Sequence, residues 1–411
     1  MYQKQESLSK LFPLETPNPD FQKLKGILAG EEKADRVHFT ELGVDVEVMQ
    51  FLLNKMMSKN FPVSEMNYIK QQKIKELMEG KRKSIDLLTK KEEETYIKSY
   101  IEFYYRMGYD FVPGLAGSWV PWMLKSKVRI TRDTAALPKK VDAFFSGDNT
   151  EGKRVWIEEV QGIITSWEDF EKFYWEKLNM ENIEINNYYE FISENLPEGM
   201  KMIPSFSLYE IVADILLGPE NMYYLLYDQP DLVEAVINEW GRICYQFYEV
   251  VLPFDCVGAI CHGDDLGHKT GTMINPELLR KLIFPWYKKY ASLAHQHGKP
   301  YWVHVCGNVL ELMEDYIEDV KIDAFHSFQD TIIPATQFSE KYGKRVGTLG
   351  GVDMDKLCRL DKESLRKYVR EILQKCMKIG RYALGSGNSI TNYMPISNYL
   401  VMLEEGLKWG E

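Results

Sequence analysis

The sequence predicts an α/β protein that folds as a TIM (β/α)8 barrel with a helical N-terminal extension. Short apolar strands alternate with amphipathic helices through the C-terminal half, without a repeated sequence, which indicates a parallel sheet covered by helices. Polar residues also follow nearly every predicted strand, where barrels build their functional sites. An open doubly wound sheet fits the alternation too, but no GxGxxG motif follows an early strand.

Composition narrows the class of protein further. The chain has 411 residues, 45% of them hydrophobic and 27% charged, as is typical of a soluble globular protein. Its net charge of -11 argues against nucleic-acid or anionic-membrane binding. The six cysteines form no CxxC motif, and the N-terminus MYQKQESLSKLF lacks an apolar signal core, so we expect a cytoplasmic protein. No apolar run reaches membrane-spanning length.

The N-terminal half is less regular than the rest. Residues 1–30 are polar and proline-containing, which predicts an extended lead-in, and residues 31–411 are expected to form a single barrel domain. Residues 37–42 and 109–114 read as short strands. Between them, a densely charged helical pattern at about residues 64–106 predicts a helical insertion with a solvated face.

Strand and helix signals then follow one another to the C-terminus. Ser166 is a predicted N-cap, with Asp169 three residues later, and Asn275 with Pro276 marks another helix start. The predicted strands lie at residues 154–162, 199–207, 257–265, 301–306, 322–328, 345–353 and 382–389. One predicted helix begins at residue 166. The others lie at residues 209–218, 231–250, 275–284, 286–298, 309–320, 338–343, 364–378 and 395–410.

The polar residues at the strand ends define a candidate rim. They are Glu41, Glu159, Ser205, Asp264, Asp265, His304, Cys306, His326, Asp353, Ser386 and Asn388. The segment KPYWVHVCGN is the most informative, because side chains two positions apart on a strand share a face. His304 and Cys306 therefore present an imidazole nitrogen and a sulfur together, which is half of a zinc site. A core histidine beside a buried thiol is the structural alternative.

Several segments together resemble the uroporphyrinogen decarboxylase superfamily over about residues 31–409. They are DRVHFTELGVD, GDDLGHKTGTMINPELLRKLIFPWYKKY, HVCGNV, IDAFHSF, RVGTLGGVD and YALGSGNSITNYMP. The resemblance implies a TIM barrel. The superfamily contains the haem-pathway decarboxylase and zinc-dependent, corrinoid-linked methyltransferases that act on methanol, methylamines or methoxylated aromatics.

The residues after the first strand indicate the branch. The decarboxylase carries an arginine-rich loop there that binds the substrate's carboxylates, whereas this chain has ELGVDVEV. The methyltransferases hold zinc with H-x-C and a later cysteine on the last strand. His304 and Cys306 match the first two ligands, but Asn388 occupies the place of the later cysteine. The candidates for a third ligand are Asp265, Asp264, His262, Cys261 and Glu159.

The resulting hypothesis is a metal-assisted methyltransferase that moves a methyl group between a small donor, such as a methoxylated aromatic, and a corrinoid protein. The predicted metal ligands are His304 and Cys306, with zinc as the metal. The remaining predicted site residues are Asp264, Asp265 and His326 as catalytic groups, and Glu41, Trp119, Glu159, Ser386, Asn388 and Tyr393 as substrate-binding groups. Each has a structural alternative in core packing, helix capping or loop support.

The sequence leaves two other functions open. One is uroporphyrinogen decarboxylation itself, and the other is a barrel that binds a tetrapyrrole or small ligand without chemistry. The absent cysteine adds weight to the second. The resemblance also implies a homodimer.

Overall fold

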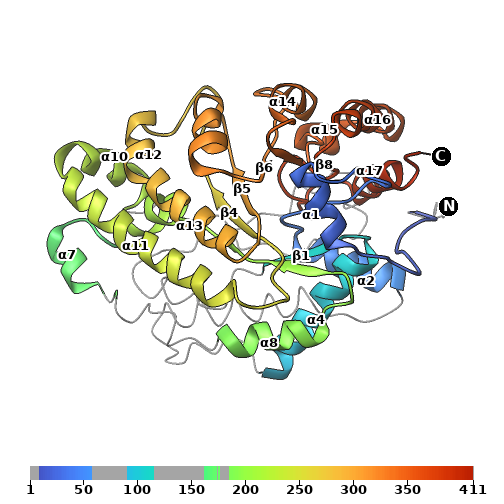
Figure 1. Cartoon of the computed structure of the whole chain (residues 1–411), viewed down its shortest axis with the longest axis horizontal. Coiled ribbons are helices and arrows are strands. Elements are labelled where there is room, and N and C mark those ends of the chain that lie inside the picture. Colours follow the sequence, from blue (N-terminus) through green and yellow to red (C-terminus); the bar gives the residue numbers. More distant parts are fainter. Residues whose placement is uncertain (1–8, 58–89, 115–161, 174, 176–184, 411) are drawn as a thin grey trace, which may run out of the picture.

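The computed structural model describes residues 9–57, 90–114, 162–173, 175 and 185–410, in which parallel strands are surrounded by helices (Figure 1). One sheet runs in the order β3-β4-β5-β6-β7-β8, and β1 pairs with β2; all these pairs are parallel. The strands are β1 Phe111–Pro113, β2 Lys201–Ile203, β3 Ser205–Phe206, β4 Ile260–Asp264, β5 Tyr301–Val305, β6 Ala324–His326, β7 Gly347–Leu349 and β8 Tyr382–Ala383. The predicted strands within the described residues are confirmed, except that residues 37–42 contribute only a single bridge, at Phe39.

Single bridges continue the parallel pairing beyond these strands. Phe39 pairs with Leu384, and the Thr40 N–H donates to the Leu384 carbonyl at 2.8 Å, so the predicted first strand lies beside β8. Met202 pairs with Val257, which joins β2 to the segment leading into β4. The pairing therefore runs from β1 through β8 to the first strand segment, as in the predicted (β/α)8 barrel, which is confirmed.

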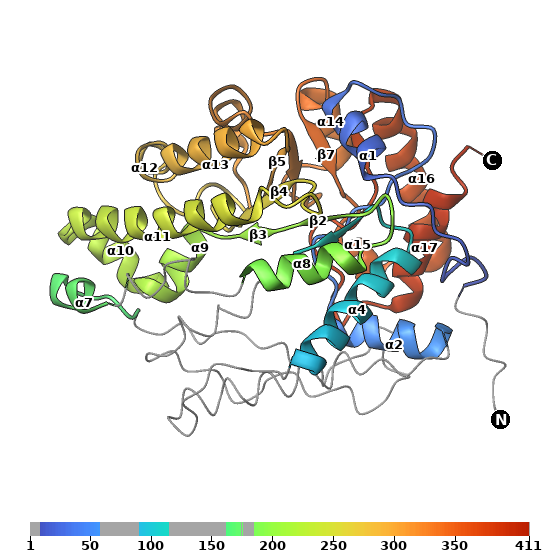
Figure 2. The same ribbon diagram turned by 60° about the horizontal axis from the view of Figure 1, so that its bottom comes forward.

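The barrel interior contains an apolar layer supplied by strands around the sheet. It consists of Phe111, Ile203, Ala259, Cys261, Trp302, Ala324, Leu349 and Ala383, together with Phe21, Leu24 and Leu28 of helix α1. Trp302 is fully buried, and its ring lies 6.0 Å from that of Phe21 and 5.7 Å from that of Phe111, between centroids. α1 thus covers one end of the barrel, beside β7 and β8 (Figure 2).

The extended lead-in predicted for residues 1–30 is wrong at its C-terminal end, because Phe21–Ala29 form helix α1. The Asp20 carboxylate accepts a bond from the Lys23 N–H, and Gly30 ends the helix with φ of 72°. Apolar residues at helical spacing bury one face of α1 against the barrel. Burial of that face outweighs the polar composition of the surrounding segment.

Helices cover the outside of the strands. They are α2 Val46–Met57, α4 Lys90–Arg106, α7 Trp167–Lys172, α8 Ile185–Asn195, α9 Tyr209–Ile211, η3 Val212–Leu216, α10 Pro219–Asp228, α11 Pro230–Val251, α12 Pro276–Leu282, α13 Phe284–Gln296, η4 Leu310–Leu312, η5 Asp315–Val320, α14 Ala335–Tyr342, α15 Met354–Arg359, α16 Lys362–Ile379 and α17 Ile396–Leu407. Ser166 and Asn275 cap α7 and α12 as predicted. Of the helices in the described residues, none is long and apolar enough to cross a bilayer.

Two elements predicted in the N-terminal half fall largely outside the described residues. Only α4 of the predicted insertion at residues 64–106 lies within them, and of the strand predicted at 154–162 only Gly162 does. The division into a lead-in and one barrel domain with an insertion stays a prediction.

Trp302 should be a principal contributor to stability, because its burial fills the barrel interior. We expect Trp302→Ala to lower the free energy of unfolding by about 3–5 kcal/mol. Trp167→Ala is the matched control, since Trp167 is 43% exposed and its loss should change stability by less than about 0.5 kcal/mol. Urea denaturation measures both, and equal losses would contradict the assignment of Trp302 to the core.

Candidate metal centre

The register of β4 and β5 decides which side chains meet at the barrel mouth. Gly263 pairs with His304 and Asp264 with Val305, and the Cys306 N–H donates to the Asp264 carbonyl at 3.1 Å. Because side chains alternate along a strand, Asp265 shares the inner side with Gly263, as Cys306 does with His304. The end of β4 therefore supplies Asp265 beside the imidazole and the thiol from β5.

The loops that follow these strands contact each other through two glycines. The Gly267 N–H donates to the Cys306 carbonyl at 3.1 Å, and the Asn308 N–H donates to the His268 carbonyl at 2.8 Å. A Cβ on Gly307 would lie 2.0 Å from the Gly267 backbone, and Gly307 has φ of 81°. Only glycine fits this position without moving the backbone. This close approach holds the ends of β4 and β5 together.

Asp265, His304 and Cys306 bring their oxygen, nitrogen and sulfur ligand atoms within 4.8 Å of one another. The Cys306 Sγ lies 3.3 Å from the His304 Nε2. Zinc accepts carboxylate, imidazole and thiolate ligands, and three protein ligands that leave a fourth position open are typical of catalytic zinc. Asp265 is exposed and the other two are partly exposed, so the donor set is accessible from solvent. The residues present therefore fit a zinc ion.

Asn388 lies at this site although it cannot supply the predicted cysteine sulfur. Its Nδ2 donates to the Cys306 Sγ at 3.3 Å. The chain thus places an amide where the resemblance implies a thiolate, and a carboxylate from β4 completes the donor set. Among the third ligands considered from the sequence, Asp265 joins the cluster.

The environment favours the neutral forms of the Cys306 thiol and the His304 imidazole in the metal-free protein. Burial raises the pKa of the Cys306 thiol, and the neighbouring Asp265 carboxylate raises it further. Burial lowers the pKa of His304, which the charges of Asp265 and Asp264 oppose. Since a thiol ligand must lose its proton, metal binding here should release one.

His326 lies behind His304. Its Nδ1 is 2.6 Å from the His304 Nδ1, and its Nε2 is 3.2 Å from the Ser386 carbonyl oxygen. The side chain is fully buried. Burial is the main reason, and the nearby His304 the second, that the pKa of His326 lies well below its ordinary value. His326 therefore contacts a candidate metal ligand, and its predicted catalytic role stays a prediction.

Glu41 and Ser386, both predicted to bind substrate, bind each other. The Ser386 N–H and hydroxyl each donate to the Glu41 carboxylate at 2.7 Å, and both residues are fully buried. Burial raises the pKa of Glu41 to about 8, although both bonds from Ser386 lower it. The pair joins the first strand segment to the end of β8.

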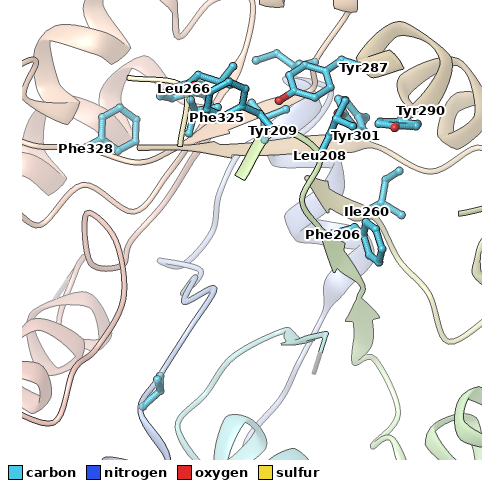
Figure 3. Close-up of a cluster of buried hydrophobic side chains, with 14 of the residues drawn as sticks. Phe206, Leu208, Tyr209, Ile260, Leu266, Tyr287, Tyr290, Tyr301, Phe325 and Phe328 are labelled. Carbon is cyan, nitrogen blue, oxygen red and sulfur yellow. The ribbon is translucent and has the colours of Figure 1, made fainter. Parts of the chain in front are cut away.

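Asp264 occupies the outer side of β4. Its carboxylate accepts the Glu210 N–H at 2.9 Å and the Leu208 N–H at 3.3 Å, and the Tyr287 hydroxyl also donates to it. His262 contacts the same carboxylate through Nε2 at 3.0 Å. Figure 3 shows Leu208 near Tyr287 and Tyr301 in this packed region. These bonds hold the start of α9, so the structure gives Asp264 a supporting role, and its predicted catalytic role stays untested.

The other residues singled out in the sequence lie elsewhere. Cys261 is 2% exposed in the apolar interior layer. Tyr393 lies in the loop before α17 and is 40% exposed. Trp119 and Glu159 lie outside the described residues.

Sequence reasoning missed Glu210, near the start of α9. Its Oε2 accepts a bond from the Ser207 hydroxyl at 3.1 Å. Burial, followed by the charges of Asp265 and Asp264, raises its pKa to about 8. The position carries no motif; only the bonds from the α9 backbone to Asp264 bring it towards the end of β4.

Comparisons with known proteins bear on the family and the fold of this chain. Residues 211–408 match the family described as Uroporphyrinogen decarboxylase (URO-D). A methyltransferase from Methanosarcina mazei shares the fold, with a TM-score of 0.62 at 13% identity, over 95% of this chain and 98% of that one. A uronate isomerase from Bacillus halodurans C-125 gives a TM-score of 0.30 at 9% identity over 94% and 86% of the two chains, too low to bear on the fold. No curated protein matches the chain.

Asp264 and Asp265 should differ in how much each contributes to stability, because Asp264 supports buried donors and Asp265 faces the candidate metal site. We expect Asp264→Ala to lower the free energy of unfolding by about 3 kcal/mol, because it leaves buried donors without an acceptor. Asp265→Ala should change it by less than about 1 kcal/mol, since an exposed carboxylate is removed. Equal effects in urea denaturation would contradict the assignment of the two faces.

The Glu41 carboxyl should make stability depend on pH. Its pKa is about 8 in the folded protein against an ordinary value of 4.5, so the folded state retains a proton that the unfolded chain releases. Stability should therefore fall as pH rises from about 5 to about 8, by up to about 1.4 kcal/mol per unit of pKa difference. Glu41→Gln mimics the protonated carboxyl and should remove the part of the fall that Glu41 causes, while Glu210, whose pKa is also about 8, keeps its own part. Parallel pH profiles for the two proteins in urea denaturation would contradict the raised pKa.

Proposed function

We propose that this chain is a corrinoid-dependent methyltransferase of the uroporphyrinogen decarboxylase superfamily, a proposal supported by the match of residues 211–408 to that family. It would transfer a methyl group between a small methylated donor, such as a methoxylated aromatic, and a corrinoid protein. The observation that carries the proposal is the convergence of an imidazole, a thiol and a carboxylate at the end of β4 and β5.

The acidic surroundings favour this activity over porphyrinogen decarboxylation. The Asp265 carboxylate lies among the candidate metal ligands, and the segment after the first strand, ELGVDVEV, has no arginine to bind substrate carboxylates. Glu41 and Glu210, whose pKa values burial raises to about 8, add negative charge only above that pH. A substrate that itself carries several carboxylates would meet repulsion from Asp265 and no matching positive charge. A neutral or cationic methyl donor does not meet this repulsion.

Asp265, His304 and Cys306 would hold the zinc ion. When bound, zinc would act as a Lewis acid towards the leaving group, or lower the pKa of a thiol acceptor. Asn388 would keep its N–H bond to the Cys306 sulfur, which stabilises negative charge on that sulfur. Asp265, the exposed ligand, leaves the centre open to substrate and to a corrinoid partner.

We propose several further residues as substrate contacts. Asn388 and Tyr393 come from the segment that follows β8, while Ser386 and Glu41 form the buried wall behind it. Trp119 and Glu159, which lie outside the described residues, belong to the proposed set on the evidence of the sequence. A flat aromatic donor would pack against the exposed ring of Tyr393.

Metal analysis and methyl transfer test the proposal together. We expect the purified chain to bind about one zinc ion, as three converging ligands require. His304→Ala, Cys306→Ala and Asp265→Ala should each lower zinc content and reduce methyl transfer from a methoxylated phenol to cob(I)alamin by at least about tenfold. Elemental analysis and the absorbance of methylcobalamin give the two readouts. Asp355→Ala, whose side chain is 69% exposed, is the control that should retain both.

Three outcomes would contradict the proposal. A zinc-free protein in which His304→Ala leaves methyl transfer unchanged would remove the metal mechanism. Efficient production of coproporphyrinogen from uroporphyrinogen would assign the decarboxylase activity instead. Tight corrinoid or porphyrin binding with no turnover and no metal dependence would indicate a binding barrel.

A further inference from the structure

The two histidines at the centre form a directed chain of hydrogen bonds. We propose that His326 is a positioning residue, which holds the Nδ1–H tautomer of His304 and so directs the His304 Nε2 lone pair to the metal. This inference rests on the metal site of the proposed function. It concerns the proton on the His304 Nδ1, the nitrogen that would not bind the metal, and it can be tested separately.

The position of each proton follows from the partners. The Ser386 carbonyl oxygen can only accept a hydrogen bond, so the His326 Nε2, at 3.2 Å, must carry the hydrogen. A neutral imidazole has one N–H, and the His326 Nδ1 is then an acceptor. The His304 Nδ1 lies 2.6 Å from it and must therefore be the donor.

The same reasoning fixes the nitrogen that is left for a metal. With its hydrogen on Nδ1, His304 has an unprotonated Nε2, which is the atom 3.3 Å from the Cys306 Sγ. If the hydrogen of His326 were on Nδ1 instead, the lone pair of its Nε2 would face the Ser386 carbonyl oxygen, which can only accept a hydrogen bond. A doubly protonated His326 would bury a positive charge whose two hydrogen-bond partners, the His304 nitrogen and the Ser386 carbonyl oxygen, carry no negative charge. Hydrogen-bond geometry excludes the first arrangement, and the cost of burying a charge disfavours the second.

Packing holds His326 in this orientation. The side chain is fully buried, and Gly350 packs so close to the ring that an added Cβ would lie only 3.1 Å from Cδ2 and Nε2. Ser386, which supplies the carbonyl, is itself fixed by two bonds of 2.7 Å to Glu41. The chain of contacts runs from Glu41 through Ser386 and His326 to His304. Such outer partners of a metal-bound histidine fix its tautomer and ring orientation.

A pair of variants tests the role. His326→Asn keeps an acceptor oxygen near the position of Nδ1, whereas His326→Leu removes it at similar size. We expect His326→Leu to weaken zinc binding by about 10–100-fold and His326→Asn to stay within a few-fold of the native chain. Competition with a chromophoric chelator measures zinc affinity directly. Equal affinities for the native chain and His326→Leu would overturn the proposal.

A second measurement needs neither a variant at His326 nor bound metal. In the metal-free native chain labelled with ¹⁵N-histidine, long-range proton–nitrogen correlations should show the Nδ1–H tautomer for His304, assigned by its loss in His304→Ala. An Nε2–H tautomer would overturn the inference. If the native chain bound no zinc, the proposed function would fail, while this spectrum would still decide the tautomer.

Discussion

The parallel register of β4 and β5 is the constraint on which the candidate centre depends. It sets Gly263 beside His304 and continues through the bond from the Cys306 N–H to the Asp264 carbonyl. The contact between Gly267 and Gly307 prevents the two loops from separating beyond the strands. A shift of one residue would send Asp265 to the helix side of the barrel and leave the imidazole and thiol without a carboxylate.

Alternation along β4 divides two neighbouring acids between different tasks. Asp264 faces the helices, where buried donors from α9 and Tyr287 use its oxygens, and Asp265 faces the mouth. β5 repeats the division, with Tyr301 fully buried on the outer side and His304 on the inner side. At their carboxyl ends these two strands thus carry packing residues on the outer face and candidate metal ligands on the inner face.

The sequence alone predicted the barrel, and it predicted two of the three candidate metal ligands, His304 and Cys306. Strand and helix periods predicted the alternation, and the spacing of His304 and Cys306 predicted their shared face. It could not choose the third donor, because that choice depends on inter-strand register. The contact of His326 with His304 likewise joins residues on two strands. The polar composition of residues 1–30 hid α1, whose stability comes from burial against the barrel.

X-ray absorption at the zinc edge of the zinc-loaded chain tests the central claim most directly, because it reports the donor atoms themselves. A site built from Asp265, His304 and Cys306 predicts a single sulfur at about 2.3 Å with nitrogen and oxygen neighbours at about 2.0–2.2 Å. Loss of the sulfur signal in Cys306→Ala should accompany it. A spectrum with no sulfur, or with two or more, would contradict this donor set.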